Sequence, residues 1–260
     1  MRRREKEVFY ETEADRRFPG SEGRFGAMKE LESLSAFRAR TGTFIYNSLP
    51  LSGGLETNPG LPLKVGADGR MEPFMGNTVV FPLPEPVRQA LERMRERLYR
   101  TCAPALAEPL EASSFHITLH DLLCGKPSRE LAERVDRVRS EALACLGQIT
   151  GGTVRLRSTA LFNMVNASMV LGFEPEDEES CGRLMAWYEA LQEVVHLDYP
   201  LTPHVTLAYF RPGTISGALT GELRRAAEEI GRWERLLLEL PAEAAEYQTF
   251  SDMNHYRRGR

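Results

Sequence analysis

The chain has 260 residues, of which 42% are hydrophobic and 27% are charged, and its formal net charge is −4. This composition is that of a globular protein, and it excludes collagen, coiled-coil and fully disordered chains. Proteins that coat long nucleic acids are usually basic, so the acidic balance argues against that class and leaves small anionic substrates open.

The sequence also bears on location. No stretch reaches the roughly 18 consecutive apolar residues of a membrane-spanning helix, and no apolar segment follows the basic start at residues 1–6, as it would in a secretory signal. The four cysteines form no CxxC pair; they are Cys102, Cys124, Cys145 and Cys181. We therefore expect reduced, buried thiols, a cytoplasmic protein and no membrane contact.

Composition divides the chain near residue 64. Residues 1–40 mix charges of both signs, and we expect a short helix near 28–38. Residues 41–75 are rich in turn residues, and Asp68-Gly69 predicts a hairpin. We predict an N-terminal arm, partly irregular, over 1–63 and a folded domain of two pseudo-symmetric lobes over 64–260.

From residue 76 the pattern of strands and helices becomes regular and repeats. Two-residue alternation predicts strands over 77–81, 115–119, 154–162, 168–173, 205–210, 236–240 and 247–250. Apolar residues at helical spacing predict helices near 85–100 and 178–196, one capped by Ser128 and one capped by Thr220. Residues 76–173 and 168–256 each place one helix before a histidine-bearing strand and another after it. The sequence therefore predicts an internally duplicated α+β fold with mostly antiparallel sheet and helices outside.

Two of the five histidines open the same four-residue pattern. Residues 116–119 read His-Ile-Thr-Leu, and residues 204–207, which lie 88 positions later (204 − 116), read His-Val-Thr-Leu. Side chains alternate along a strand, so each histidine shares a face with the threonine two residues on, and the aliphatic residues take the core face. If the two halves pack with pseudo-twofold symmetry, both His/Thr pairs converge on one site.

Two imidazoles and two hydroxyls suit phosphoester chemistry. One neutral imidazole can take a proton from a nucleophile while one imidazolium gives a proton to the leaving oxygen, and both states are accessible between about pH 5 and 8. Threonine hydroxyls can donate hydrogen bonds to the phosphoryl oxygens on which charge develops. We expect His116, Thr118, His204 and Thr206 to be catalytic, with no metal and no other cofactor.

The paired His-x-Thr-x motifs resemble the signature of the 2H phosphoesterase superfamily, which includes 2′,3′-cyclic nucleotide phosphodiesterases and 2′-5′ RNA ligase-like proteins. The resemblance spans roughly 76–256. It implies a bilobal, internally duplicated fold around a central cleft, with metal-independent catalysis by the four motif residues. A little-characterised branch is also similar over 68–78 and 250–256, but it supplies no settled substrate. The resemblance implies a nucleotide or a short RNA end as substrate, and we expect a monomer.

Three further residues are candidates for substrate contact. Asn77 begins the first core strand and can reach a phosphate, and Tyr256 can stack on a base. Arg157 can also reach a phosphate, although we favour a solvated strand face as its explanation. If its strand continues, His120 shares the face of His116 and can support it, but we expect His120 to leave the strand and be solvated or bonded locally. We expect Tyr209 to lie on the core side of its strand by simple alternation.

Two other functions stay open. The first is a non-catalytic module that binds a nucleotide or an RNA end, although the presence of both motifs argues against it. The second is a metal-dependent hydrolase that uses His116, His120 and His204. The sequence has no HExxH helix to support it, and Asp121 is the only carboxylate near these motifs.

Overall fold

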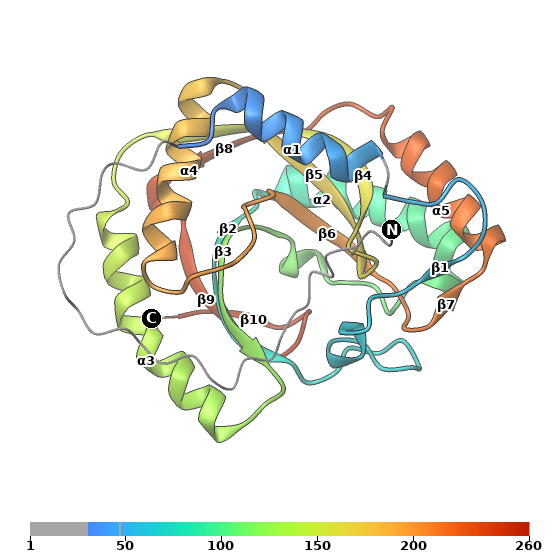
Figure 1. Ribbon diagram of the computed structural model, residues 1–260, viewed down its shortest axis with the longest axis horizontal. Coiled ribbons are helices and arrows are strands. Elements are labelled where there is room, and N and C mark those ends of the chain that lie inside the picture. Colours follow the sequence, from blue (N-terminus) through green and yellow to red (C-terminus); the bar gives the residue numbers. More distant parts are fainter. Residues whose placement is uncertain (1–30, 47, 260) are drawn as a thin grey trace, which may run out of the picture. The chain divides into compact units, whose positions relative to one another are not determined.

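The structure is a computed structural model that describes residues 31–46 and 48–259, and the compact unit begins at Leu31. Two four-stranded antiparallel sheets form its centre (Figure 1). Sheet 1 has the strand order β10-β9-β2-β3, and sheet 2 has the order β6-β5-β4-β8. The strands are β1 (Leu55–Glu56), β2 (Met75–Pro82), β3 (His116–Gly125), β4 (Thr153–Met164), β5 (Ser168–Pro175), β6 (His204–Tyr209), β7 (Thr214–Ile215), β8 (Leu237–Pro241), β9 (Glu246–Phe250) and β10 (Tyr256–Arg258). The α-helices are α1 (Leu34–Tyr46), α2 (Glu85–Cys102), α3 (Arg129–Gln148), α4 (Glu178–Gln192) and α5 (Gly217–Ile230).

The chain repeats one order of elements. The first copy is β2-α2-β3-α3, and the second is β5-α4-β6-α5. In each copy the second strand carries a His-x-Thr motif and forms an edge of its sheet, with the copy's first strand paired beside it. The predicted duplication and the predicted α+β class with antiparallel sheets and outer helices are therefore confirmed.

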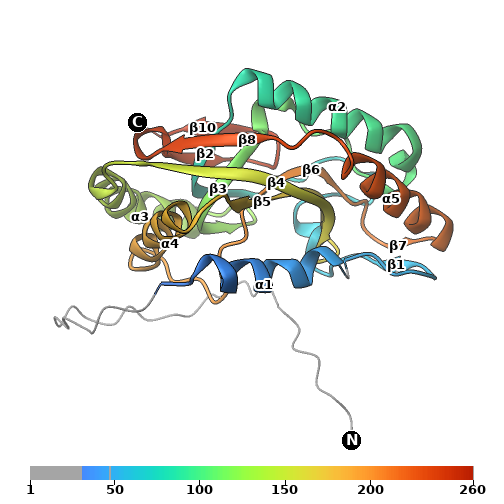
Figure 2. The same cartoon turned by 90° about the horizontal axis from the view of Figure 1, so that it is seen from above.

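Helices of both copies pack on each sheet: α3 and α4 contact sheet 1, and α2, α4 and α5 contact sheet 2. Helices α2 and α5 pack together, with α2 against β6 and α5 against β4, whereas α3 and α4 both contact β3. Helix α1 contacts β4 from the side opposite to α2 and α5, as Figure 2 shows. The predicted apolar face of α2 is buried and includes Leu91 and Leu98. Burial of each such leucine contributes about 1.5–3 kcal/mol, so these faces hold the two copies together.

Residues 31–63, which the sequence assigns to the arm, contribute secondary structure to this unit. Phe37 of α1 is fully buried, and Leu55 of β1 pairs with Ile215 of β7. The helix expected near 28–38 instead begins at Leu34, and residues 28–30 of that prediction lie outside the described residues. Packing against β4 determines where α1 begins and ends. The sequence did not indicate these ends, because the mixed charges of this region show no helical periodicity.

Two predicted turns and caps are confirmed and one is wrong. The hairpin forms with a Val65–Met71 bridge, and Gly69 takes a φ of 87°, which glycine adopts without strain. Ser128 caps α3 by accepting a hydrogen bond from the Leu131 amide at 3.1 Å. Thr220 does not cap α5; it lies inside the helix, and the cap is Ser216.

Both motif strands contain a β-bulge at the same place. In β3, Thr118 pairs with Val80 and His120 pairs with Val79, so Leu119 is an extra residue. A bulge of this kind reverses the alternation of side chains beyond it. Leu119 and His120 are therefore both buried, and Asp121 returns to the face that carries the motif.

The second copy repeats this geometry. Thr206 pairs with Val170 and Ala208 pairs with Met169, so Leu207 is the extra residue of β6. Leu207 and Ala208 are buried in succession, and Tyr209 returns to the face of His204. The expectation that Tyr209 lies on the core side is therefore wrong, because simple alternation does not anticipate a bulge.

Two expectations from composition can be compared with the structure. Within the described ranges, no helix is both long and apolar enough to cross a membrane. All four cysteines are free thiols; Cys102 and Cys181 are buried as expected, but Cys124 is exposed.

Gly76 tests the close packing of sheet 1. A Cβ at this position would lie 2.3 Å from the carbonyl oxygen of Leu123 and 2.6 Å from the Phe250 ring. The carbonyl cannot move without disturbing the pairing of β2 and β3, so Gly76→Ala should lower the free energy of unfolding by about 1–3 kcal/mol. The measurement is urea denaturation followed by circular dichroism.

The matched control is Gly182→Ala in α4, where nothing lies within 4 Å of the added carbon. Alanine is favoured over glycine inside a helix by about 0.5–1 kcal/mol, so this variant should be slightly more stable than the wild type. An unchanged denaturation midpoint for Gly76→Ala would contradict the steric argument.

Candidate active site

Strands β3 and β6 bring the two motifs together. The strands lie at the edges of their sheets and contact each other. His116, Thr118, His204 and Thr206 are all partly buried, and His204 is close enough for its charge to act on His116. We call the faces of β3 and β6 that carry these four residues the inner face.

The two histidines make the same hydrogen bond. Nδ1 of His116 lies 2.7 Å from the carbonyl oxygen of Ser114, and Nδ1 of His204 lies 2.7 Å from that of Thr202. A carbonyl oxygen only accepts hydrogen bonds, so the neutral rings carry their proton on Nδ1. Each Nε2 is then left with its lone pair for a ligand.

Burial controls the charge of these imidazoles. It lowers the pKa of His116 to about 4 and lowers the pKa of His204 in the same direction. The carbonyl partners and the charge of Asp121 oppose this effect on both rings, while Lys64 adds to it at His204. Both histidines are therefore neutral at pH 7.

The bulges place Asp121 and Tyr209 on the inner face. Reasoning from the sequence did not place either residue there. Asp121 accepts a hydrogen bond from the hydroxyl of Tyr199 at 2.9 Å. The Tyr209 hydroxyl lies 3.2 Å from Sδ of Met253, and burial raises the pKa of Tyr209. One feature of the sequence could have indicated this placement: each of the two residues follows its motif histidine by five positions.

His120 occupies the core instead of solvent, which corrects the expectation. Only 1% of its surface is exposed, and its ring centroid lies 5.1 Å from that of Tyr188 in α4. Among the described residues, neither ring nitrogen has a hydrogen-bond partner of good geometry. Burial accordingly lowers the pKa of His120.

Lys64 supplies positive charge near His204. Its Nζ lies 5.1 Å from the Phe74 ring centroid and 5.9 Å from that of Tyr209, which are distances for cation–π contact. Its charge lowers the pKa of both His204 and Tyr209. Nothing in the sequence indicated that Lys64 lies near the histidines.

Tyr256 lies beside His116, as its candidacy for substrate contact requires. The two ring centroids are 4.7 Å apart in an edge-to-face arrangement, and Phe250 lies 5.3 Å from Tyr256 on the other side. Burial raises the pKa of Tyr256 well above its usual range.

The exposed histidines at the surface pair with neighbouring carboxylates, His196 with Asp198 and His255 with Asp252.

Asn77 and Arg157 both make contacts within the protein. The burial of Asn77 argues against its contact with substrate, whereas the Arg157 side chain is 38% exposed and its assignment stays a prediction. Asn77 is 1% exposed, donates to the Tyr247 hydroxyl at 3.0 Å and accepts from the Leu123 amide at 2.9 Å. Nε of Arg157 donates to the Glu174 carboxylate at 2.8 Å. Both side chains therefore stabilise the sheets.

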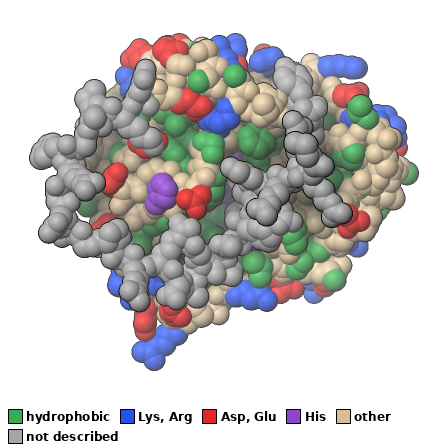
Figure 3. All heavy atoms as spheres, in the orientation of Figure 1, with side chains coloured by type: hydrophobic (Ala, Val, Ile, Leu, Met, Phe, Trp, Pro, Cys, Tyr) green, Lys and Arg blue, Asp and Glu red, His purple; other side chains and the backbone are tan. Residues whose placement is uncertain are grey.

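Acidic, hydrophobic and histidine side chains occur together on one face of the molecule. On the face drawn in Figure 3 a histidine lies toward the middle with acidic side chains near it, and both acidic and basic side chains lie around the periphery. This mixture differs from the broadly basic surface that proteins use to hold long nucleic acids.

Helix α1 holds the segment that precedes His204. Arg40 pairs with Glu32 at 2.7 Å and donates to the carbonyl oxygen of Leu201 at 2.9 Å. A longer contact of 3.4 Å reaches the Thr202 hydroxyl. Because the Thr202 carbonyl is the partner of His204 Nδ1, Arg40 fixes the loop that orients this ring.

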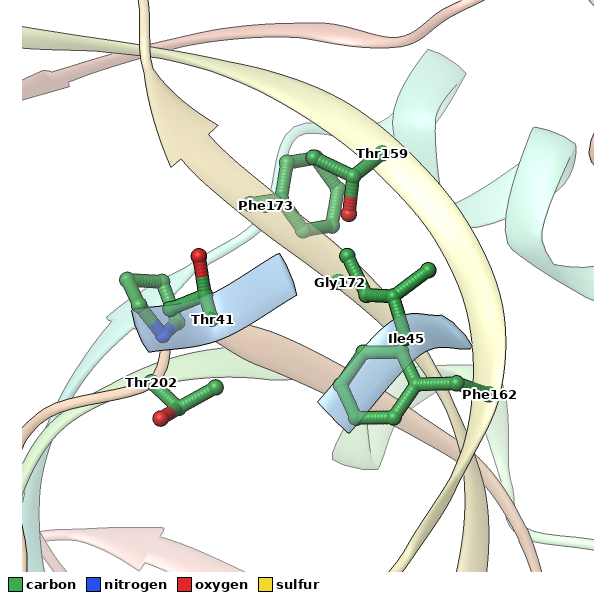
Figure 4. A pocket seen from close by; sticks show the side chains of 8 residues that line it. Thr41, Ile45, Thr159, Phe162, Gly172, Phe173 and Thr202 are labelled. Carbon is green, nitrogen blue, oxygen red and sulfur yellow. The ribbon is translucent and has the colours of Figure 1, made fainter. Parts of the chain in front are cut away.

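A small cavity separates α1 from β5, lined in part by Thr41, Ile45, Gly172 and Thr202 (Figure 4). Gly172 pairs directly with His204 across the strands. A Cβ at Gly172 would lie 2.7 Å from side-chain atoms of both Phe162 and Thr159 in β4, so glycine leaves room for these two side chains beside β5.

Across 31–46 and 48–259, no three histidine, cysteine or carboxylate side chains cluster as metal ligands would.

No protein-family model matches the sequence, and no curated protein matches it. Among solved structures, the chain is similar to ATU0111, a conserved protein of unknown function from Agrobacterium tumefaciens strain C58. The TM-score is 0.60 with 20% identity, over 79% of this chain and 93% of that chain. Lower TM-scores of 0.44 are found for E. coli LigT in apo form, at 14% identity over 73% and 96% of the two chains, and for TT0787 of Thermus thermophilus, at 17% over 71% and 94%. At 20% identity, the likeness to ATU0111 is one of fold.

The lowered histidine pKa values predict how stability depends on pH. Folded-state pKa values below 6.5 for His116, His120 and His204 mean that the unfolded chain binds more protons under mildly acidic conditions. The free energy of unfolding should therefore fall as pH falls from about 6.5 to about 4. Urea denaturation at several pH values measures this slope.

His120→Leu removes one of these groups without touching the motifs, so its slope should be shallower than that of the wild type. The matched control is Leu143→Ala on the exposed surface of α3, which removes no titratable group and should leave the slope unchanged. If stability rises on acidification through this range, the argument from burial is wrong.

Proposed function

We propose that this protein is a metal-independent 2H-type phosphodiesterase that hydrolyses a cyclic phosphate or a 2′-5′ phosphodiester of a nucleotide or RNA end, as a monomer. The observation that carries the proposal is the twofold repetition of one arrangement. Each motif histidine has the same carbonyl partner on Nδ1, the same threonine two residues on and the same bulge beyond it. A structural role for either histidine alone does not account for this repetition.

In the proposed reaction, the lone pair on Nε2 of one imidazole takes a proton from water as the water oxygen bonds to phosphorus. The other ring, protonated, gives its Nε2 proton to the ribose oxygen as the phosphorus–oxygen bond breaks. Thr118 and Thr206 donate hydrogen bonds to the non-bridging oxygens, where negative charge increases. The proton count balances, because one ring gains the proton that the other loses.

In this proposal the charge of the substrate phosphate raises the pKa of the histidines, so that one ring can be protonated. Burial keeps both imidazoles neutral in the free protein, and a phosphate bound between them favours imidazolium. Binding therefore raises the pKa of the pair, and the two titrations are coupled rather than independent. The rings of Tyr256 and Phe250 beside His116 support a nucleotide substrate, because they offer a surface on which a base can stack.

Replacement of either histidine tests the reaction. His116→Ala and His204→Ala should each abolish turnover of 2′,3′-cyclic mononucleotides or 2′-5′ dinucleotides, because each removes a proton-transfer group. Thr118→Ala and Thr206→Ala should lose less, on the order of 10²–10³ in rate, because each removes one donor. Circular dichroism should remain that of the wild type. A histidine variant with nearly full activity would exclude the two-histidine mechanism, and binding without turnover by the wild type would favour a non-catalytic module.

The dependence on pH and on metals tests the proton balance. The rate should rise and then fall with pH, because one ring must be neutral and the other charged. The profile of kcat, which reports the substrate complex, should lie at higher pH than that of kcat/KM, because bound phosphate raises the pKa values that burial lowers. Prolonged EDTA treatment should leave both profiles unchanged. Loss on chelation with recovery on addition of one metal would contradict the metal-free mechanism.

A further inference from the structure

Asp121 is an unexpected side chain for a site that binds phosphate. The bulge at Leu119 turns it onto the inner face, where it is exposed. Its charge acts on His116 and His204. A carboxylate repels any anion bound nearby, so it weakens phosphate binding unless the substrate brings something that compensates.

The corresponding position of the second copy carries no charge of this kind. Position 209 lies five residues after His204, as position 121 lies five after His116, and both follow a bulge. In the second copy the residue is Tyr209, whose ring lies beside the Lys64 ammonium group. The carboxylate therefore breaks the twofold similarity of the two copies. The bulged strand does not itself require a carboxylate, because the same bulge in the second copy is followed by a tyrosine.

Tyr199 holds this carboxylate in place. Its hydroxyl donates to Oδ2 of Asp121 at 2.9 Å, from the loop that leads to His204. Among the described residues no side chain donates to Oδ1. Because a carboxylate oxygen accepts more than one hydrogen bond, Asp121 can accept from a bound molecule without losing its contact to Tyr199.

We propose that Asp121 is a specificity-determining residue: it accepts a hydrogen bond from a hydroxyl or amino group that the substrate carries near the scissile phosphate. The substrate class is then a phosphodiester with a neutral, donor-bearing group on the Asp121 side, such as a ribose with a free hydroxyl. Phosphodiesters with a second phosphate at that point are disfavoured by repulsion. This inference rests on the proposed function.

The experiment compares two probes that differ at one group. One is adenosine 2′,3′-cyclic phosphate with a free 5′-hydroxyl, and the other is the same compound with a 5′-phosphate. The wild type should prefer the hydroxyl compound in kcat/KM, and Asp121→Asn should reduce that preference about tenfold or more, because it removes the like charge while keeping the shape. Asp136→Asn on the exposed surface of α3 is the matched control and should leave the preference unchanged.

Tyr199→Phe tests the positioning of the carboxylate. Without the hydroxyl, Asp121 loses its partner, so the preference should fall partway toward that of Asp121→Asn. If Asp121→Asn instead lowers kcat for both probes by the same factor, Asp121 acts on the histidines and not on the substrate, and the proposal is wrong.

A binding measurement separates this proposal from the proposed function. Calorimetry compares adenosine 2′-monophosphate with adenosine 2′,5′-bisphosphate on the wild type and on Asp121→Asn. If no probe is turned over but the wild type prefers the monophosphate and the variant does not, hydrolysis is wrong and selection by Asp121 stands. If turnover occurs but neither the kinetic nor the binding preference changes in the variant, selection is wrong and hydrolysis stands. If the wild type neither binds nor turns over these compounds, both are overturned.

Discussion

The two β-bulges determine which side chains meet on the inner face. Each bulge follows a His-x-Thr sequence at the edge of a sheet and reverses the alternation after Leu119 or Leu207. Without them, His120 and Ala208 would face inward, and Asp121 and Tyr209 would point into the hydrophobic layers beneath the helices. A carboxylate in that layer would be costly to bury, so the bulges are compatible with the core as well as with the site.

A balance between burial and nearby charge defines the chemistry of the site. Burial favours neutral imidazole at both motifs, while the carbonyl groups of Ser114 and Thr202 and the carboxylate of Asp121 favour imidazolium. The carbonyl contacts also choose the tautomer, so orientation and charge come from the same short hydrogen bonds. Helix α1 contributes to this balance from a distance, because Arg40 fixes the loop that contains the Thr202 carbonyl.

Periodicity predicted most of the fold, because the helices and strands bury their apolar residues at regular spacing. The motif duplication likewise predicted that the two histidines would be brought together, since it depends on the order of elements and not on their detail. Three features could not be predicted. The bulges leave no trace in the alternation of residue types, so His120 was expected outside its strand and Tyr209 on the core side of its strand. Lys64 and Tyr199 reach the inner face from loops, and Asn77 and Arg157 find partners that are distant in sequence.

The repeated halves are covalently joined, and this permits a difference that a symmetrical assembly forbids. A homodimer built from one half would carry the same residue five positions after each histidine, either two carboxylates or two phenols. In a single chain these positions hold Asp121 and Tyr209. The inner face consequently has a direction. A ligand whose two ends differ chemically would meet two inequivalent orientations on it, even though the two His/Thr pairs themselves match.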